Sequence, residues 1–183
     1  LEKNKIAPPF LIYVGNLYPY KNLDLALKAL KILEKEIPNL KFFVASARDV
    51  FHQRFSQLVK NYHLEEKVLM PGFVPTQDLV ALFKQSSAFI FPSLSEGFGI
   101  PGCNAMAAGV PVIASNIPVF KEVYDNSVLY FDPKRQEDLA EKIKILLTYD
   151  KLRQNLIEKG QNQAAKYSWQ KMAKETLEVY KEA

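Results

Sequence analysis

The strongest constraint on the fold is a segment in the middle of the chain, where two short apolar runs flank a loop and a small-residue helix. Ala88–Phe91 and Val110–Ala114 are apolar and have the length of buried strands. Between them we expect the loop Pro92–Ile100 and a helix over 101–109, because proline suits the first helical turn and glycine the residue after the last. A strand, a helix and another buried strand in this order indicate a parallel sheet.

The same alternation continues on both sides of this segment. Four further apolar runs are predicted to be strands: Phe10–Val14, Leu40–Ala45, Val68–Met70 and Ser127–Phe131. Six strands that alternate with helices predict an α/β fold, a Rossmann-like doubly wound parallel sheet of about six strands with C-terminal helices after it.

Four polar side chains stand where helices are expected to begin. Asn22, Asp49, Thr76 and Ser168 can each accept a hydrogen bond from a free N–H group of the first turn. The helix after Ser168 carries Trp169 on an apolar face. We therefore expect this last helix to dock, either on the sheet of this chain or on another domain.

Ligands of doubly wound sheets bind at the carboxyl ends of the strands, where the strand order reverses. This rule brings three loops to one rim: Gly15–Lys21, Gly72–Thr76 and Pro92–Ile100. In the third loop, Gly97 and Gly99 precede a helix, and the free N–H groups of a helix start favour a phosphate. A phosphate-and-polyol site is the working hypothesis.

Two side chains complete this hypothesis. Glu96 adds a carboxylate that can accept hydrogen bonds from hydroxyl groups. Lys21 follows the first strand and can direct its ammonium to a phosphate at the same rim. An isolated lysine is usually an ordinary surface residue. Lys21 is a candidate for phosphate binding because of its position at the rim.

Composition and missing motifs exclude several other classes of protein. The 183 residues are 48% hydrophobic and 24% charged, as in a single folded domain. The single cysteine, Cys103, excludes an internal disulfide and fits a reducing, cytoplasmic compartment. A net charge of +4 is too small and too scattered to predict nucleic-acid binding. No apolar run has the roughly 18 residues of a membrane span.

The motifs of other nucleotide-binding enzymes are absent as well. The chain has neither GxGxxG nor GxxxxGK[ST], which disfavours dinucleotide-dependent dehydrogenases and P-loop NTPases. His52 and His63 have no cysteine partners or HExxH motif, and no Asp-x-Asp pair occurs, so no metal site is expected. GxSxG is absent, and a serine hydrolase is therefore disfavoured.

The chain resembles the C-terminal, donor-binding domain of GT-B-fold retaining glycosyltransferases of glycosyltransferase family 4, also called group 1. The similar pieces follow one another almost from end to end: YVGNLYPYKNLDLALKAL, KVLMPGFVPTQDLVALFKQSSAFIFPS, SEGFGIPGCNAMAAGVPVIAS, LYFDP and YSWQKMAKETLEVY. Their order and spacing match the family pattern, which makes the resemblance specific.

The resemblance implies a role for each matching residue. Glu96 and Lys21 are the implied catalytic residues, Glu96 contacting the donor sugar and Lys21 neutralising the diphosphate. The implied donor and phosphate contacts are Gly15, Asn16, Lys21, Gly97, Phe98, Gly99 and Ile100. Asn104 matches the ribose-binding position, and Phe73 and Val74 the segment that meets the base. Relatives transfer the sugar with retention and need neither metal nor cofactor besides a GDP- or UDP-linked sugar donor.

The sequence departs from the family pattern at three places. The second glutamate of the Glu-x7-Glu motif is replaced by Asn104, which loses a charge-assisted hydrogen bond worth about 1–3 kcal/mol to the ribose. Asn16 stands where many relatives have arginine. Ser46-Ala47-Arg48 lacks the glycines that are common after the second strand.

These features predict three parts of the chain. Residues 1–9 are expected to be a linker remnant and 10–167 the nucleotide-sugar-binding domain. Residues 168–183 are expected to form a crossover helix that docks on a missing N-terminal acceptor domain. The chain is then the donor half of a retaining glycosyltransferase, transferring a hexose such as mannose to a polysaccharide or glycoconjugate and inactive alone.

Two alternatives stay open. The chain is a non-catalytic nucleotide-sugar-binding or partner-interaction module, for which Asn104 is the main argument, or half of a GT-B sugar epimerase. The expected partners are a nucleotide sugar and the missing domain, without nucleic acid. The expected location is the cytoplasm, with at most a peripheral contact to the inner face of the membrane.

Overall fold

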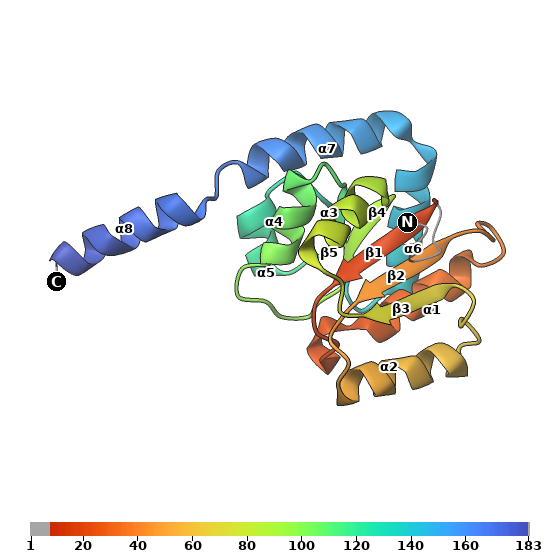
Figure 1. The fold of residues 1–183 in the computed structure, drawn as a ribbon. Coiled ribbons are helices and arrows are strands. Elements are labelled where there is room, and N and C mark those ends of the chain that lie inside the picture. Colours follow the sequence, from red (N-terminus) through yellow and green to blue (C-terminus); the bar gives the residue numbers. More distant parts are fainter. Residues whose placement is uncertain (1–7, 183) are drawn as a thin grey trace.

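Six parallel strands form the centre of the fold, in the order β3-β2-β1-β4-β5-β6 (Figure 1). The computed structural model describes residues 8–182, so most of the expected linker 1–9 lies outside the described residues. The strands are β1 (Phe10–Val14), β2 (Lys41–Ala45), β3 (Val68–Gly72), β4 (Ala88–Phe91), β5 (Val112–Ser115) and β6 (Leu129–Phe131). Every neighbouring pair is parallel, which confirms the predicted doubly wound sheet.

Helices cover both faces of this sheet. Their bounds are α1 (Leu23–Leu33), α2 (Val50–Asn61), α3 (Thr76–Gln85), α4 (Ile100–Ala107), α5 (Pro118–Tyr124), α6 (Gln136–Thr148), α7 (Asp150–Ala164) and α8 (Trp169–Glu182). On one face α1 packs against α2 and α6, while α4 and α5 pack against α7. Right-handed crossovers that leave β1 and β4 in opposite directions put α1 and α4 on opposite faces.

The strand order reverses between β1 and β4. Ile12 of β1 pairs with Phe43 of β2 on one side and with Phe89 of β4 on the other. All three side chains are fully buried, as expected for central strands that are covered on both faces. The loops after β1 and β4 therefore leave a rigid core side by side, which fixes the positions of the residues that they carry.

Two of the four predicted helix caps are confirmed. The Asp49 carboxylate accepts from the His52 N–H at 2.9 Å, and the Ser168 hydroxyl accepts from the Lys171 N–H at 3.1 Å. The predictions for Asn22 and Thr76 were wrong. Asn22 precedes α1 in a left-handed conformation (φ 57°) and its amide instead donates to a carbonyl 111 residues away. Thr76 is already inside α3, which begins after Pro75.

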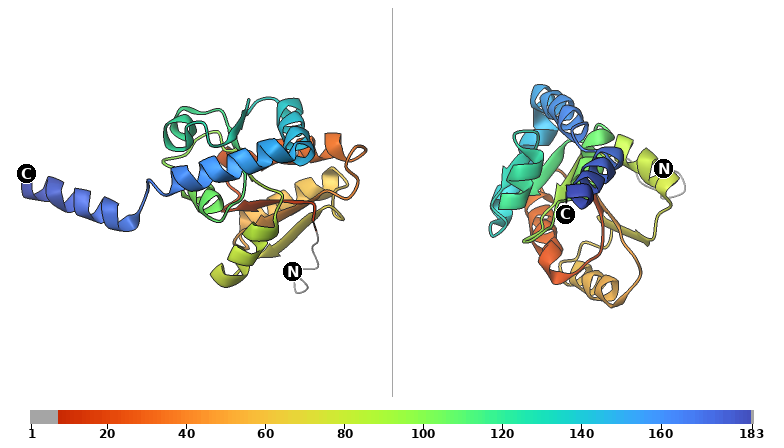
Figure 2. Two further views of the ribbon diagram at one scale, coloured as in Figure 1. Left: turned by 90° about the horizontal axis from the view of Figure 1, so that it is seen from above. Right: turned by 90° about the vertical axis from the view of Figure 1, so that its left-hand side faces the viewer.

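The helix α8 leaves the layered body and extends into solvent (Figures 1 and 2). None of its described side chains is buried, although its sequence is amphipathic. The expectation that it docks on this sheet was wrong, because its apolar face touches no strand. Docking on another domain stays a prediction.

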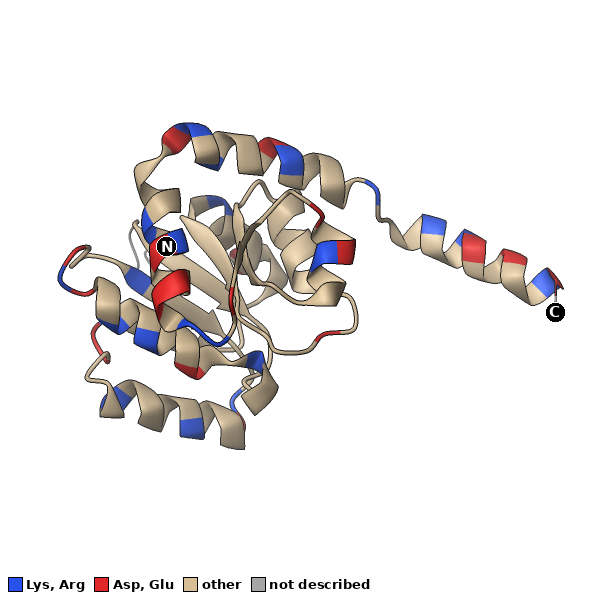
Figure 3. Ribbon diagram, turned by 180° about the vertical axis from the view of Figure 1, so that it is seen from behind, with Lys and Arg blue, Asp and Glu red and all other residues tan. Residues whose placement is uncertain are grey.

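The surface charges are mixed in sign. In Figure 3, basic and acidic residues are both spread over the surface helices. Along α1 and α6, and at the end of α1, oppositely charged residues form i, i+3 or i, i+4 ion pairs. This distribution fits the small net charge of +4. Among the described helices, none is both long enough and apolar enough to cross a membrane.

Candidate functional site

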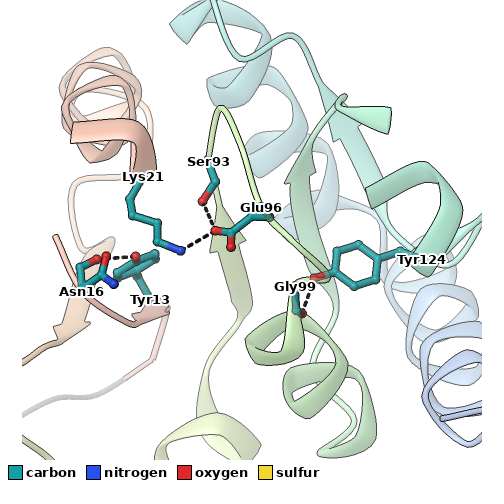
Figure 4. A network of polar contacts seen from close by, with 7 residues as sticks. All are labelled: Tyr13, Asn16, Lys21, Ser93, Glu96, Gly99 and Tyr124. Atoms are coloured by element: carbon teal, nitrogen blue, oxygen red, sulfur yellow. Dashed lines mark hydrogen bonds and ion pairs between the residues drawn. The ribbon is translucent and has the colours of Figure 1, made fainter. Parts of the chain in front are cut away.

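An ion pair joins the loops that follow β1 and β4. The Lys21 Nζ lies 2.5 Å from the Glu96 Oε1, and their side chains are only 11% and 12% exposed (Figure 4). Lys21 ends the short 3-10 helix Pro19–Lys21, while Glu96 lies in the loop that leads into α4. The two residues predicted to be catalytic are 75 positions apart in the sequence, and the fold brings them into direct contact.

Neighbouring groups hold this pair in place. The hydroxyl of Ser93, which is fully buried, donates to the same Glu96 Oε1 at 2.7 Å. The Lys21 ammonium lies 5.0 Å from the centre of the Tyr20 ring and 5.8 Å from that of Phe91, within the range of a cation–π contact. The second carboxylate oxygen of Glu96 makes no hydrogen bond with a described residue, so it is available to a hydroxyl group.

The two loops are also joined through their backbones. The Leu94 N–H of the second loop donates to the Tyr20 carbonyl of the first at 2.8 Å. On the β1 side alone, the Tyr13 hydroxyl donates to the Asn16 carbonyl at 2.7 Å. The side-chain oxygen of Asn16 is buried and has no hydrogen-bond partner in the described part of the chain. An orphaned buried polar atom is costly, so this position suits a ligand that can bond to it.

The start of α4 presents free backbone donors to the same rim. Over residues 8–182, the N–H groups of Gly97, Phe98 and Gly99 donate to no protein acceptor. A side chain added at Gly97 would meet nothing within 4 Å, so the loop is open on this side. Free N–H groups at a helix N-terminus, next to an ammonium, form a site for an anion.

Asn104 lies exposed on α4, one turn into the helix. It lines an apolar groove between the start of α4 and the start of α8. The other lining residues include Phe98, Ile100, Cys103, Tyr167, Trp169, Met172 and Val179. Phe98 meets Tyr167 edge to face, with ring centres 5.1 Å apart, and this contact joins the rim loop to the segment before α8. Burial raises the pKa of the Cys103 thiol to about 11, so the thiol stays protonated at neutral pH and is unreactive.

The expected base-binding segment lies at the same edge of the sheet but near its end. Phe73 and Val74 directly follow β3, two strands away from β1, and the Phe73 side chain is 80% exposed. Arg48 lies across Gly72, and its guanidinium donates to the Pro71 carbonyl at 2.9 Å. No described contact joins this segment to Lys21 or Glu96, so its role depends on a ligand that spans the rim.

Two residues at the rim were not assigned a role from the sequence. The absence of GxSxG gave Ser93 no role, yet its hydroxyl donates a hydrogen bond to Glu96, three residues later. Tyr124 was not considered, although its hydroxyl donates to the Gly99 carbonyl. A serine at that short spacing from an acid is a usable sequence signal, whereas nothing local marks Tyr124.

No group of three or more histidine, cysteine, aspartate or glutamate side chains that could hold a metal ion occurs within the described residues. The polar groups at the rim are instead an ammonium, a carboxylate, hydroxyls and backbone N–H groups.

The rim lies at the carboxyl ends of a six-stranded, doubly wound parallel sheet, and the sequence comparison identifies the family. The sequence profile of the group 1 glycosyl transferases matches residues 2–163. The chain therefore belongs to the group 1 glycosyltransferases, as the resemblance predicted.

Individual relatives agree with this assignment. The chain is 31% identical over 183 residues to the O-antigen chain mannosyltransferase B of Escherichia coli, covering 99% of this chain and 48% of that protein. It is 33% identical over 135 residues to an O-antigen chain mannosyltransferase of Salmonella typhimurium, covering 74% and 37%. The chain thus spans half or less of the length of these curated relatives.

Solved structures share the fold. Sucrose-phosphate synthase from Thermosynechococcus elongatus superposes with a TM-score of 0.87 at 23% identity, covering 99% of this chain and 47% of that one. The C-terminal domain of a group 1 glycosyl transferase from Francisella tularensis gives 0.75 at 24% identity, covering 90% and 89%. The second match shows that a domain of this extent has been crystallised by itself.

Proposed function

We propose that this chain is the donor-binding half of a retaining glycosyltransferase. In this proposal the rim between β1 and β4 binds a nucleoside-diphosphate sugar. The observation that carries it is the contact between Lys21 and Glu96, 2.5 Å apart, beside the free N–H groups of Gly97–Gly99. A cation and free amides suit a diphosphate, and a carboxylate suits the sugar hydroxyls attached to it.

The roles follow from the chemistry of each group. Lys21 and the start of α4 neutralise the diphosphate as it leaves, which stabilises the transition state electrostatically. Glu96, oriented by Ser93, accepts hydrogen bonds from the sugar and fixes its position. Asn104 meets the ribose, and the exposed Phe73 together with Val74 meets the base. No metal takes part in this scheme.

The donor that we propose is GDP-mannose, because several relatives of this chain are named as mannosyltransferases. The acceptor is a polysaccharide or glycoconjugate in the cytoplasm. A second domain supplies its binding site, and α8 docks on that domain through its apolar face. Trp169 and Tyr180, 67% and 74% exposed, support this role for α8. Without that domain we expect negligible transfer.

Calorimetric titration with GDP, UDP and ADP, each with and without Mg²⁺, tests the donor site. We expect GDP to bind best and Mg²⁺ to change nothing. If none of the three binds at millimolar concentration, about −4 kcal/mol, the donor-site proposal fails for this chain.

The variant Lys21→Gln tests the phosphate role. Its amide can still donate to Glu96, so the fold is retained while the charge is lost. We expect GDP affinity to fall about tenfold or more and guanosine affinity to stay the same. Lys28→Gln, at an exposed ion pair of α1, is the matched control and leaves both affinities unchanged. Equal losses for GDP and guanosine would contradict the phosphate role of Lys21.

A second candidate function, a non-catalytic nucleotide-sugar-binding module, is favoured by Asn104. A neutral amide at this exposed position of α4 binds ribose less well than a carboxylate. Asn104→Glu should therefore tighten GDP binding by about 5- to 150-fold, since it adds a charge-assisted hydrogen bond of about 1–3 kcal/mol. Gln53→Glu, on the surface of α2, controls for the added charge. Unchanged affinity in Asn104→Glu would remove the ribose role.

A further inference from the structure

Tyr124 is a buried tyrosine that the scheme above does not use. It ends α5, is 0% exposed, and donates from its hydroxyl to the Gly99 carbonyl at 2.5 Å (Figure 4). Burial raises the pKa of Tyr124 well above its usual value, so the hydroxyl stays protonated and remains a donor. Its partner is the residue that immediately precedes α4.

An aromatic stack fixes the position of this hydroxyl. The Tyr124 ring stacks on Phe120 with centres 5.0 Å apart, and Phe120 packs on Phe91 at 4.7 Å. Phe91 is the last residue of β4, the strand that leads into the rim loop. This stack connects the Tyr124 ring to the end of β4. It therefore fixes the position of the Tyr124 hydroxyl below the rim loop that the hydroxyl contacts.

The first turn of α4 is shaped around this ring. A Cβ atom at Gly99 would lie 2.1 Å from the Tyr124 hydroxyl oxygen, and one at Gly102 would lie 2.3 Å from it. Gly99 also has a φ of 94°, which side chains rarely adopt. Only glycine at both positions lets the helix start approach the tyrosine this closely.

The hydrogen bond sets the direction of a backbone donor. The Gly99 carbonyl accepts from Tyr124 and from the N–H groups of Gly102, at 2.9 Å, and Cys103, at 3.4 Å. In a planar trans peptide, the carbonyl of Gly99 and the N–H of Ile100 point in opposite directions. Drawing the carbonyl toward the buried ring therefore turns the Ile100 N–H away from it, and as the first residue of α4 its N–H has no partner in the helix.

We propose that Tyr124 is a positioning residue of the donor site, which holds the Gly99–Ile100 peptide so that the N–H groups at the start of α4 face the diphosphate. This inference rests on the proposed function and adds a residue to its site. Tyr124 itself does not touch the ligand. Its ring supports the fold, and its hydroxyl orients the anion-binding turn.

The test compares Tyr124→Phe with Tyr130→Phe in the whole chain. The Tyr130 hydroxyl also donates its one proton to the backbone, within reach of the carbonyls of Phe120 at 2.9 Å and Asp125 at 2.7 Å, and has no hydrogen bond to Gly99. Tyr124→Phe loses a buried hydrogen bond and Tyr130→Phe a partly buried one, so both variants should melt at lower temperature. The affinities for GDP and for guanosine, measured by calorimetry, separate a positioning role from a structural one.

We expect Tyr124→Phe to bind GDP about tenfold more weakly and guanosine as well as before, so that the ratio of the two affinities falls. In Tyr130→Phe this ratio stays at its original value. If Tyr124→Phe lowers only the melting temperature and keeps the ratio, the positioning role is overturned while the donor site stands. If the unmodified chain binds no GDP, the proposed function fails, and the inference fails with it.

The unmodified chain allows the same test should Tyr124→Phe not fold. A buried, hydrogen-bonded hydroxyl proton exchanges slowly and is observable by NMR. Saturation with GDP should shift the Tyr124 hydroxyl proton and the Ile100 amide, and guanosine should shift neither. If neither signal moves when GDP binds, the inference is wrong.

Discussion

Lys21 and Trp169 depart from the usual burial of their residue types in opposite directions. Lysine is almost never buried, yet Lys21 is only 9% exposed, and tryptophan is usually well covered, yet Trp169 is 67% exposed. The buried lysine has its partner, Glu96, within the chain. The exposed tryptophan, on a helix without buried residues, lacks such cover. The Lys21–Glu96 pair is complete within this chain, whereas the apolar side chains of α8 stay unburied in the described structure.

Among changes to the Lys21–Glu96 pair and to α8, the largest effect should follow from Lys21→Met. Removing the cation leaves the Glu96 carboxylate partly buried with only Ser93 as a partner, which should lower the free energy of unfolding by about 3 kcal/mol. Urea denaturation measures this loss. Lys28→Met, at a pair whose side chains are 40% and 39% exposed, should change it by less than about 0.5 kcal/mol. Equal effects would mean that the burial of Lys21 has no energetic consequence.

Glu96→Gln should have a smaller effect, which strengthens the binding of GDP and weakens that of GDP-mannose relative to GDP. Loss of the carboxylate removes a negative charge near the diphosphate, so GDP should bind about three- to tenfold more tightly. GDP-mannose should lose the charge-assisted bonds to its sugar, so its affinity relative to GDP falls. Calorimetry with both ligands measures the ratio. Glu34→Gln, at an exposed pair, is the control, and a ratio unchanged in Glu96→Gln would argue against sugar contact by Glu96.

The smallest effect belongs to Trp169. Because its side chain is mostly exposed and none of the described residues of α8 is buried, Trp169→Ala should change stability by less than about 0.5 kcal/mol. Phe131→Ala, at a fully covered aromatic of β6, should cost about 3–5 kcal/mol in the same denaturation experiment. A clear loss of stability in Trp169→Ala would show that α8 folds back onto the body in solution.

Much of the fold could be predicted from local patterns. The six strands, the helix Pro118–Tyr124 and the cap at Asp49 depend on apolar runs and on neighbouring residues. The rim also follows, because the carboxyl ends of parallel strands share one edge. The position of Lys21 and Glu96 at the same rim could be predicted in this way, but their 2.5 Å contact could not.

The features that could not be predicted depend on contacts between residues that are far apart in the sequence. Asn22 fails as a cap because its amide bonds to Pro133, and this contact accompanies a left-handed backbone that no local pattern predicts. The Tyr124 hydroxyl donates to the carbonyl of Gly99, which lies 25 residues earlier in the sequence. This contact can be recognised only in the folded structure, where α5 packs under the rim loop. None of the described side chains of α8 is buried, so its amphipathic pattern predicts a helix but not its position.

The fit of Tyr124 against Gly99 and Gly102 has a consequence for the evolution of this chain. The space that the two glycines leave empty is the space that the tyrosine ring and its hydroxyl fill. A relative with a side chain at the position of Gly102 must then carry a smaller residue at the position of Tyr124. The two positions should change together across the family, and neither change should survive without the other.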